Sequence, residues 1–398
     1  MDFSFSPEEE RFRLELREWL KNNLPAGWGT PAAGKAPKGQ TRLEFLRDWQ
    51  RRLHTGGYLG LSWPKEYGGR GASMVELAIF NEEMAKAEAP GPLNVLGLSM
   101  AGPTIIVHGT EEQKKRYLPK ILNCEEIWCQ GFSEPGSGSD VASIRTRAEL
   151  KGDEFIVNGQ KVWTSLAHIA DWCMLLVRTD PDAPKHRGIS YILVDMKSPG
   201  ITVRPLRQMT GESDFNEVFL EDVRVPRENL VGELHNGWGV AITTLMNERG
   251  TGSFGTQARF RIIYDNLVAL AKKSTVDGQP AARDPQIRQQ LAQHLIDVEI
   301  LKYNCFRNFT RLLRGGTPGP EGSILKLWWS ELNQRMEHTA MTLQGPYGQL
   351  LRESPWVVEN GRWQYNFLRS LANTIEAGTS EIQRNIIAER VLRMPKGR

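Results

Sequence analysis

The sequence predicts an α+β fold with several domains: an all-α N-terminal domain, a middle antiparallel β-barrel or sandwich, and a C-terminal domain resembling a four-helix bundle. Apolar residues recur three or four apart in the first third, short strand-like runs follow in the middle, and helical spacing then returns. With 398 residues, 40% of them hydrophobic, the chain can build more than one core. We place the domains at residues 1–126, 127–234 and 235–398.

The N-terminal domain opens with a helix whose start is visible in the sequence. Ser6 can cap it, Pro7 suits its first position, and Glu9 completes a capping box. Thr110 is a second cap, because acids follow it directly. Further helices are expected over residues 42–53 and 73–87, with a Gly/Pro/Ala-rich loop over 25–39.

Strand signals fill the middle domain. The pair Asn158-Gly159 stands between apolar residues, which is the strongest short-range signal for a hairpin turn. Since no helical interval separates the strands, an antiparallel sandwich or barrel is favoured over a parallel Rossmann sheet. Besides the segments flanking that pair, strands are expected over residues 173–177, 189–194, 201–203 and 218–223.

Helical periodicity resumes after Gly237 and continues to the end of the chain. The loop 315–320, rich in Gly and Pro, interrupts it. Helices are expected over residues 238–247, 258–271, 285–313, 324–343 and 382–392. The C-terminal domain is therefore expected to be a bundle.

Charge and cysteine content exclude several classes of function. The 50 basic and 47 acidic residues are spread along the chain and leave a formal charge of +3, so we expect no nucleic-acid partner. No apolar run is long enough to span a membrane, and the acidic N-terminus is unlike a signal peptide, so a cytoplasmic location is expected. The 4 cysteines have no metal-ligand spacing and are expected to be reduced thiols, with no metal site.

One segment pair indicates a flavin site. Residues 131–140 read Gly-Phe-Ser-Glu-Pro-Gly-Ser-Gly-Ser-Asp, and small residues of this kind let a backbone approach a ring or pyrophosphate closely. The segment 161–165 follows with Trp163, whose indole offers an apolar face for stacking. A Gly-Ser-Gly run alone is more often a turn, but the two segments together favour a flavin ligand.

Together with other motifs, these segments resemble the acyl-CoA dehydrogenase family over essentially the whole chain. The motifs lie far apart, so a chance match at all of them is improbable. They are residues 132–140 (FSEPGSGSD), 162–165 (VWTS), 221–226 (EDVRVP), 343–348 (LQGPYG) and 377–384 (AGTSEIQR).

The resemblance implies a homotetrameric or homodimeric flavoprotein that uses FAD to oxidise the α,β bond of an acyl-CoA and passes electrons to an electron-transfer flavoprotein. It implies that Phe132 and Ser133 meet the flavin pyrimidine, that Trp163 lies against the ring, and that Ser165 reaches flavin N5. Ser139 would lie near the phosphopantetheine arm of the substrate or the flavin diphosphate.

The resemblance also implies FAD contacts near the C-terminus. Thr379 and Glu381 would hold the diphosphate and ribose of FAD, and a Gly-Thr-Ser helix start suits an anion independently of any family. Gly345 corresponds to the family's glycine turn, although its glutamine falls at Gln344. The family's Arg-x-x-Phe-Gly motif is missing, and either Arg283 or Arg288 could substitute for its arginine.

The reaction also needs a base to remove the α-proton, and a buried carboxylate suits that task. Many relatives carry it where this chain has Ala377, next to Glu376. A branch that includes isovaleryl-CoA dehydrogenase places it in a Leu-x-x-Glu-Arg context, which is Leu245 to Arg249 here. We therefore predict Glu248 as the base, with Glu376 as the alternative, and Arg249 beside the CoA moiety.

Three other activities fit the same motifs. An acyl-CoA oxidase would differ only in letting oxygen reach the reduced flavin. A non-catalytic subunit could lend an FAD or CoA surface to a hetero-oligomer, and a flavin monooxygenase could use the same scaffold.

Overall fold

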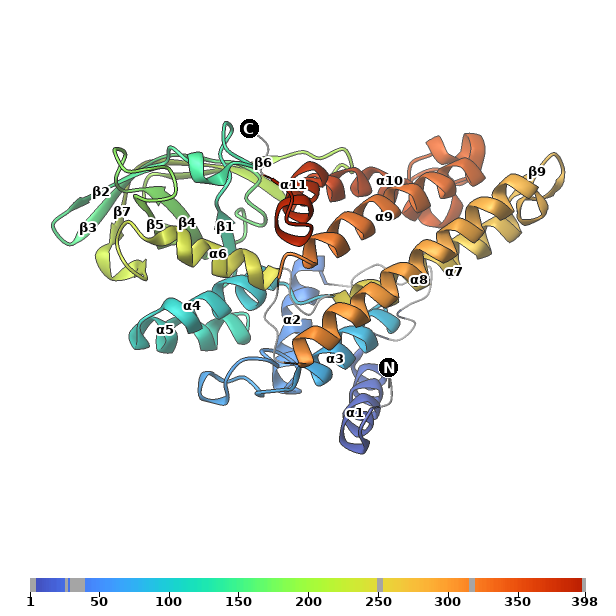
Figure 1. Cartoon of the computed structure of the whole chain (residues 1–398), viewed down its shortest axis with the longest axis horizontal. Helices are drawn as coiled ribbons and strands as arrows, with labels where there is room; N and C mark the ends of the chain where they lie inside the picture. Colours follow the sequence, from blue (N-terminus) through green and yellow to red (C-terminus); the bar gives the residue numbers. More distant parts are fainter. Residues whose placement is uncertain (1–4, 26–27, 29–39, 249–252, 315–318, 396–398) are drawn as a thin grey trace. The chain divides into compact units, whose positions relative to one another are not determined.

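The computed structural model describes residues 5–25, 28, 40–248, 253–314 and 319–395. Contacts divide the chain into two compact units. The helical unit comprises Met1–Lys35, Met74–Ala89 and Arg249–Arg398, and the sheet unit comprises Ala36–Ser73 and Pro90–Glu248 (Figure 1). The predicted order of a helical, a strand-rich and a second helical region is confirmed.

Long helices build the helical unit. Helices α7 (Ser253–Lys273) and α8 (Pro285–Leu313) run beside each other and are joined by the small hairpin β9 (Thr275–Val276) and β10 (Gln279–Pro280) (Figure 1). Both pack against α9, and the apolar core between them includes Leu267, Leu301 and Met336. The other helices are α1 (Pro7–Asn23), α3 (Met74–Lys86), α9 (Gly322–Gln344), α10 (Arg362–Ser370) and α11 (Ser380–Ile386).

The predicted helix starts are confirmed. The Ser6 hydroxyl accepts a hydrogen bond from the Glu9 N–H, and the Glu9 carboxylate accepts one from the Ser6 N–H, which completes the capping box of α1. Thr110 forms the same arrangement with Gln113 at the start of α5 (Glu111–Leu122). Most of the predicted loop 25–39 lies outside the described residues.

An open, mixed sheet forms the centre of the sheet unit. Its strand order is β6-β7-β3-β2-β4-β5-β8, with β1 paired to β4. The predicted strands are present, but the sheet is not wholly antiparallel, because β1 and β2 run parallel to β4. The strands are β1 (Trp128–Gly131), β2 (Arg147–Lys151), β3 (Glu154–Lys161), β4 (Trp172–Arg178), β5 (Ile189–Asp195), β6 (Ile201–Leu206), β7 (Phe215–Pro226) and β8 (Leu230–Val231).

Four helices complete this unit. Helix α6 packs on strand β5, α4 contacts α5 and α6, and α2 belongs to the same unit. Their bounds are α2 (Arg42–Thr55), α4 (Gly102–His108), α5 (Glu111–Leu122) and α6 (Gly237–Glu248).

The prediction of a hairpin turn at Asn158-Gly159 is wrong. Both residues lie inside β3, and the pairing with β7 shifts register between Val157 and Gly159. A Cβ on Gly159 would stand 2.7 Å from the Thr146 Cα, so close approach of the backbone demands glycine there. The turn between β2 and β3 is Gly152-Asp153, where Gly152 has φ +62°.

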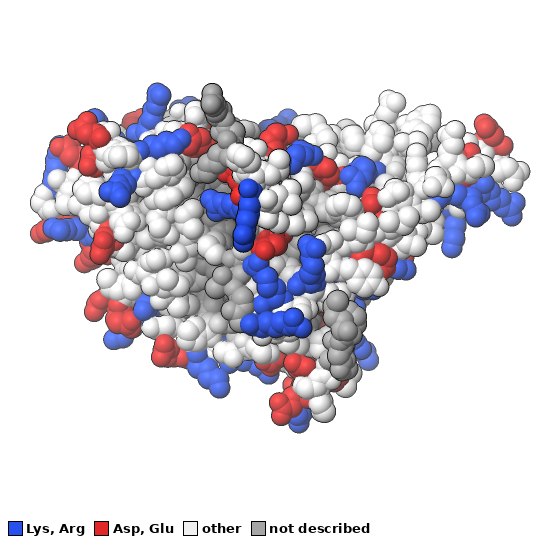
Figure 2. All heavy atoms as spheres, viewed as in Figure 1, with Lys and Arg blue, Asp and Glu red and all other residues white. Residues whose placement is uncertain are grey.

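All four cysteines are unpaired and buried, as expected. Among the described residues, no helix is long and apolar enough to cross a membrane. Over the sheet region, Figure 2 shows basic and acidic side chains interspersed, in agreement with surface pairs such as Arg224 with Glu154.

Candidate functional site

The two segments predicted to bind flavin begin where strands β1 and β3 end. Phe132 and Ser133 directly follow β1, and Trp163 to Ser165 follow β3 after one residue. The Val162 N–H donates to the Ser133 carbonyl at 2.9 Å, so the structure brings the two segments together. The Phe132 ring is buried edge-on to Tyr191 with ring centroids 6.0 Å apart, and the Phe132 carbonyl accepts from the buried Lys161 ammonium at 3.2 Å.

Trp163 has an uncommon backbone conformation and an exposed side chain. Its φ is +59°, a region that bulky residues seldom adopt, and 62% of its surface is accessible. Its only described ring neighbour is Phe215, edge-on at 6.3 Å. The exposed indole on this turn offers a large apolar face on which a flat ring can stack.

Asn216, the second residue of β7, holds this turn. Its carbonyl accepts from the Thr164 N–H at 3.0 Å, and its side-chain amide donates to the Thr164 carbonyl at 2.9 Å. Asn216 and Thr164 are completely buried. The Thr164 Oγ1 has no hydrogen-bond partner among the described residues, and Ser165 beside it is half-buried. Asn216 therefore holds the turn in place, and the Thr164 hydroxyl could still form a hydrogen bond with a ligand.

The glycine-rich loop is closed at its base by Glu134. Its carboxylate accepts from the Arg145 N–H at 2.7 Å, the Thr146 N–H at 2.9 Å and the Lys161 ammonium at 2.8 Å. Burial acts to raise the pKa of Glu134, but the Lys161 charge and these hydrogen bonds hold it below its ordinary value. Burial lowers the pKa of Lys161.

The tip of this loop is open. Gly136 and Gly138 have no positive φ, and a Cβ on either would meet nothing within 4 Å, so the fold itself does not require glycine there. Ser139 beside them is exposed. Small residues that the backbone does not need leave room for a ligand to approach, which fits the predicted cradle.

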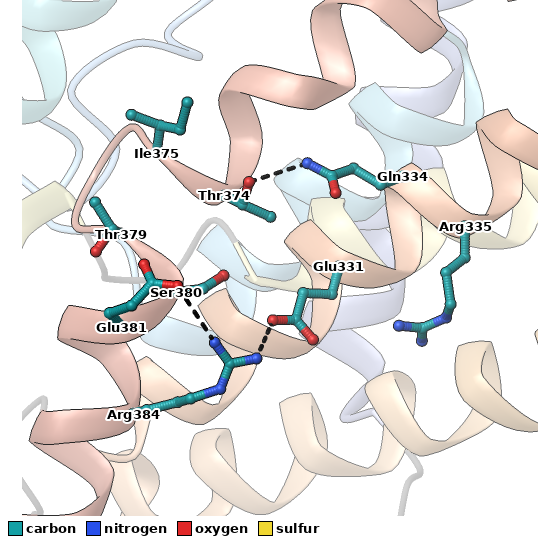
Figure 3. A pocket seen from close by; sticks show the side chains of 9 residues that line it. All are labelled: Glu331, Gln334, Arg335, Thr374, Ile375, Thr379, Ser380, Glu381 and Arg384. Carbon is teal, nitrogen blue, oxygen red and sulfur yellow. Dashed lines mark hydrogen bonds and ion pairs between the residues drawn. The ribbon is translucent and has the colours of Figure 1, made fainter.

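In the helical unit, a cavity of about 540 Å³ opens beside the start of α11. Thr379 caps α11 by accepting from the Ile382 N–H at 3.2 Å, and Glu381 is exposed beside it. Both line the cavity, so the structure brings these two predicted FAD contacts together (Figure 3). Hydrogen bonds from its own N–H and from the Thr379 hydroxyl lower the pKa of Glu381.

Charged side chains from two helices frame this cavity. Figure 3 shows Arg384 of α11 reaching to Glu331 of α9, while Gln334 donates to the Thr374 hydroxyl at 3.0 Å. The Ser380 hydroxyl is buried and has no partner in the described part of the chain. The cavity thus combines paired charges with an unused hydroxyl, a lining that suits a polar ligand.

The remaining predicted cofactor contacts are exposed. Gly345 follows α9 with φ +53° and open space around its Cβ position. Gln344 before it points inward, where its amide oxygen accepts from Gln364 at 3.2 Å. Arg283 and Arg288 are exposed near the start of α8. None of these residues lines the cavity beside α11.

The two candidate bases differ in their surroundings. Glu248 is the last residue of α6; its side chain and the whole of Arg249 lie outside the described residues. Glu376 accepts two hydrogen bonds from Arg369, at 2.9 and 3.2 Å, and one from Asn373 at 2.8 Å. A carboxylate held in this way already has a structural role.

The sequence reasoning assigned no role to Lys161, Asn216 or Arg384. Lys161 continues the inward-facing series of β3, in which Phe155 and Val157 are buried, so a lysine at that position signals a buried pair. Asn216 gave no signal, because its contact with Thr164 spans 52 residues of sequence.

The sequence matches three family models, which describe three consecutive domains of one enzyme family. They are described as the N-terminal, middle and C-terminal domains of acyl-CoA dehydrogenase, and they match residues 6–125, 129–223 and 235–392.

Curated relatives and solved structures agree. Acyl-CoA dehydrogenase IpdE1 of Mycolicibacterium smegmatis is 41% identical over 400 residues, which cover 98% of each chain. The solved "Tcur3481-Tcur3483 steroid ACAD" is 31% identical with a TM-score of 0.85, and the match covers 100% of both chains. The ChsE4-ChsE5 complex of Mycobacterium tuberculosis is 32% identical with a TM-score of 0.84, also over 100% of both chains.

Proposed function

Since the chain belongs to the acyl-CoA dehydrogenase family, we propose that it desaturates an acyl-CoA to the trans-2-enoyl-CoA, with Glu248 as the base that removes the α-proton. The observation that supports this proposal best is that Tyr191 of β5 contacts both the segment predicted to bind flavin and helix α6. Its ring contacts Phe132 of the flavin-type segment, and its hydroxyl accepts from Thr244 of α6 at 3.4 Å. Thr244 precedes Glu248 by one helical turn.

Enzymes of this family bind FAD, which when bound accepts the hydride that leaves the β-carbon. We propose that Trp163 stacks against the ring, that the segments at Phe132, Ser133 and Ser165 line its polar edge, and that Ser139 lies near a phosphate-bearing arm. The open space at Gly136 and Gly138 and the unpartnered Thr164 hydroxyl support this placement, because both are unused by the fold.

For the diphosphate and ribose of FAD we propose the cavity at α11, with Thr379 and Glu381 as contacts. The buried, unpartnered Ser380 hydroxyl supports a polar ligand there. Gly345, and Arg283 or Arg288, are proposed as further contacts. The domain boundaries 1–126, 127–234 and 235–398 are part of the same proposal.

Glu248 is preferred to Glu376 because the partners of Glu376 leave it little freedom to take a proton. A general base must reach the α-carbon hydrogen and change its charge during the reaction. Taking a proton at Glu376 would weaken two hydrogen bonds from Arg369. The α6 end is anchored by the Thr104–Thr244 hydrogen bond of 2.8 Å, which supports a fixed position for the helix that carries Glu248. We propose that Arg249 contacts the CoA moiety.

The proposed acyl group is a bulky, fused-ring one. The support is the name "steroid ACAD" of a solved structure that this chain resembles over its whole length. We also propose an electron-transfer flavoprotein as the acceptor, a homotetramer or homodimer as the assembly, and a cytoplasmic location. A hetero-oligomer is the second candidate, since the similar ChsE4-ChsE5 complex is named for two different chains.

An anaerobic titration of the purified protein with acyl-CoAs tests the proposal. We expect bound FAD, and we expect its visible absorption to bleach with fused-ring acyl-CoAs at lower concentration than with short straight chains. Preference for straight chains would contradict the substrate class. Bound FAD that no thioester bleaches would favour a non-catalytic subunit, and rapid bleaching followed by oxygen consumption in air would favour an oxidase.

A further inference from the structure

A buried ion pair lies next to the two segments predicted to bind flavin, Phe132–Ser133 and Trp163–Ser165, which are called the flavin-type segments below. Lys161 is completely buried, and its ammonium is 2.8 Å from the Glu134 carboxylate and 3.2 Å from the Phe132 carbonyl. Removing both charges from water has a high cost, which the attraction between them offsets only when the remaining hydrogen bonds are satisfied. A pair of this kind therefore calls for a role other than stability.

The pair joins strands that the sheet itself does not join. Within the described residues β1 pairs with β4, whereas β3 pairs with β2 and β7, so β1 and β3 are not neighbours in the sheet. Their ends are joined by the backbone bond from Val162 to Ser133 and by the ion pair. Lys161 ends β3, and its ammonium holds the first residue after β1. A Cβ on Gly131 would stand 2.7 Å from the Leu175 Cδ1 and 3.0 Å from the Cys173 Sγ, so glycine at the end of β1 allows the close approach of the β4 side chains.

Glu134 extends the connection to the far end of the glycine-rich loop. Its two oxygens take the N–H groups of Arg145 and Thr146 as well as the ammonium, so one carboxylate links the start of the loop, its end and β3. The Val162 N–H adds a bond to the Ser133 carbonyl next to the pair. All the polar groups involved lie in the sheet unit, and each is paired with another group of that unit.

We propose that Lys161 and Glu134 are positioning residues for FAD: they set the spacing between the Phe132–Ser133 segment and the Trp163–Ser165 turn before FAD binds. The proposal rests on the proposed function for its ligand, while the tether itself can be tested without one. The flavin would then meet a preformed surface and lose little affinity to ordering the two segments.

The test compares Lys161→Met, Glu134→Gln and the double variant Lys161→Met/Glu134→Gln with wild type. Lys161→Met alone leaves a buried, unpaired carboxylate and is expected to lower the melting temperature. The double variant removes both charges and keeps similar volumes, so we expect it to recover most of that stability. Lys197→Met is the matched control, because it removes a 2.8 Å ion pair with Asp171 from an exposed lysine.

Two readouts separate positioning from stability. The first is hydrogen exchange of FAD-free protein, in which the double variant should lose protection at the Arg145, Thr146 and Val162 amides. The second is FAD affinity by flavin fluorescence, in which the double variant should bind about tenfold more weakly, as expected for losing a charged hydrogen bond. Lys197→Met should change neither readout.

Wild-type FAD affinity in a folded double variant would overturn the proposal, and so would unchanged amide protection. If the double variant failed to fold, Glu134→Gln and Lys161→Arg would decide: weakened FAD affinity in Glu134→Gln with wild-type affinity in Lys161→Arg, which keeps a donor, supports positioning, and wild-type affinity in a folded Glu134→Gln opposes it. If wild type bound no FAD, the proposed function would fail, while the hydrogen-exchange result would still report on the tether.

Discussion

Two buried carboxyl groups, Glu134 in the sheet unit and Glu337 in the helical unit, have opposite environments. Glu134 accepts hydrogen bonds from an ammonium and two backbone N–H groups, and its pKa lies below the ordinary value. Glu337 in α9 is 1% exposed; burial raises its pKa to about 8, against the Arg362 charge and a hydrogen bond with Asn366. One Glu337 oxygen has no partner among the described residues.

The difference shows that partners, rather than burial alone, decide whether a carboxyl is charged. The sheet unit surrounds its buried charge with a complete set of partners beneath the flavin-type segments. In the helical unit the charged groups at the α11 cavity are paired nearer the surface, as for Arg384 and Glu331. We therefore expect substitutions near the flavin-type segments of the sheet unit to have larger effects than substitutions at the α11 cavity.

The same comparison distinguishes the two candidate bases, and the largest effect is expected here. Glu248→Gln should lower kcat by about 10²–10⁴ while FAD stays bound, because general-base catalysis is lost. Glu376→Gln loses a partly exposed ion pair and should cost no more than about 1 kcal/mol of stability. Stopped-flow reduction of the flavin by substrate measures both. If Glu376→Gln lowered the rate more than Glu248→Gln does, Glu376 would be the base and Glu248 would not.

Glu337 should make stability depend on pH. Its folded pKa of about 8 exceeds the ordinary 4.5, so the folded state keeps a proton that the unfolded state releases. The contribution of Glu337 to the free energy of unfolding should therefore be fully present below about pH 4.5. It should fall by about 1.4 kcal/mol per pH unit as the pH rises to about 8. Urea unfolding of Glu337→Gln should show a flatter profile and higher stability at pH 8.5.

The exposed Glu353→Gln is the control for this experiment, since it should leave the pH profile unchanged. If Glu337→Gln retained the full wild-type slope between pH 5 and 8, another group would have to account for it. Glu337 would then no longer support the contrast in pKa between the two buried carboxyl groups.

Asn216→Ala tests whether the Trp163 turn is as rigid as its contacts suggest. The change leaves the buried Thr164 carbonyl without its side-chain donor and should cost about 1–3 kcal/mol in unfolding free energy. Flavin affinity should fall as well, because the turn loses its support. Asn22→Ala removes an exposed asparagine bonded to Glu18 and should change stability by less than about 0.5 kcal/mol. Equal effects in both variants would contradict a rigid turn.

The smallest effect is expected at the α11 cavity. Thr379→Ala removes the cap of a seven-residue helix and should cost about 1 kcal/mol, whereas Thr379→Ser keeps a capping hydroxyl and should be close to neutral. Thermal unfolding measures both. A loss at Thr379 larger than at Asn216 would reverse the ranking of the two regions.

Much of the fold could be predicted because its signals are local. A capping box joins residues three apart, and helix α8 spans Pro285–Leu313 as expected because its periodicity continues without a break between Pro285 and the Gly-rich loop. Trp163 was also found from sequence, because an indole follows a run of small residues, and Thr379 was found through the family resemblance and its Gly-Thr-Ser helix start.

The amino-acid sequence by itself determined the order of helical and strand-rich regions, the helix starts and the family. Only the tertiary structure decided that Asn158-Gly159 is a bulge packed on Thr146, that Lys161 lies buried under Phe132, and that Glu376 is held by Arg369. The physical reason is range: propensity and capping act within one turn of chain, whereas burial and the partners of a charge come from residues that only folding brings together.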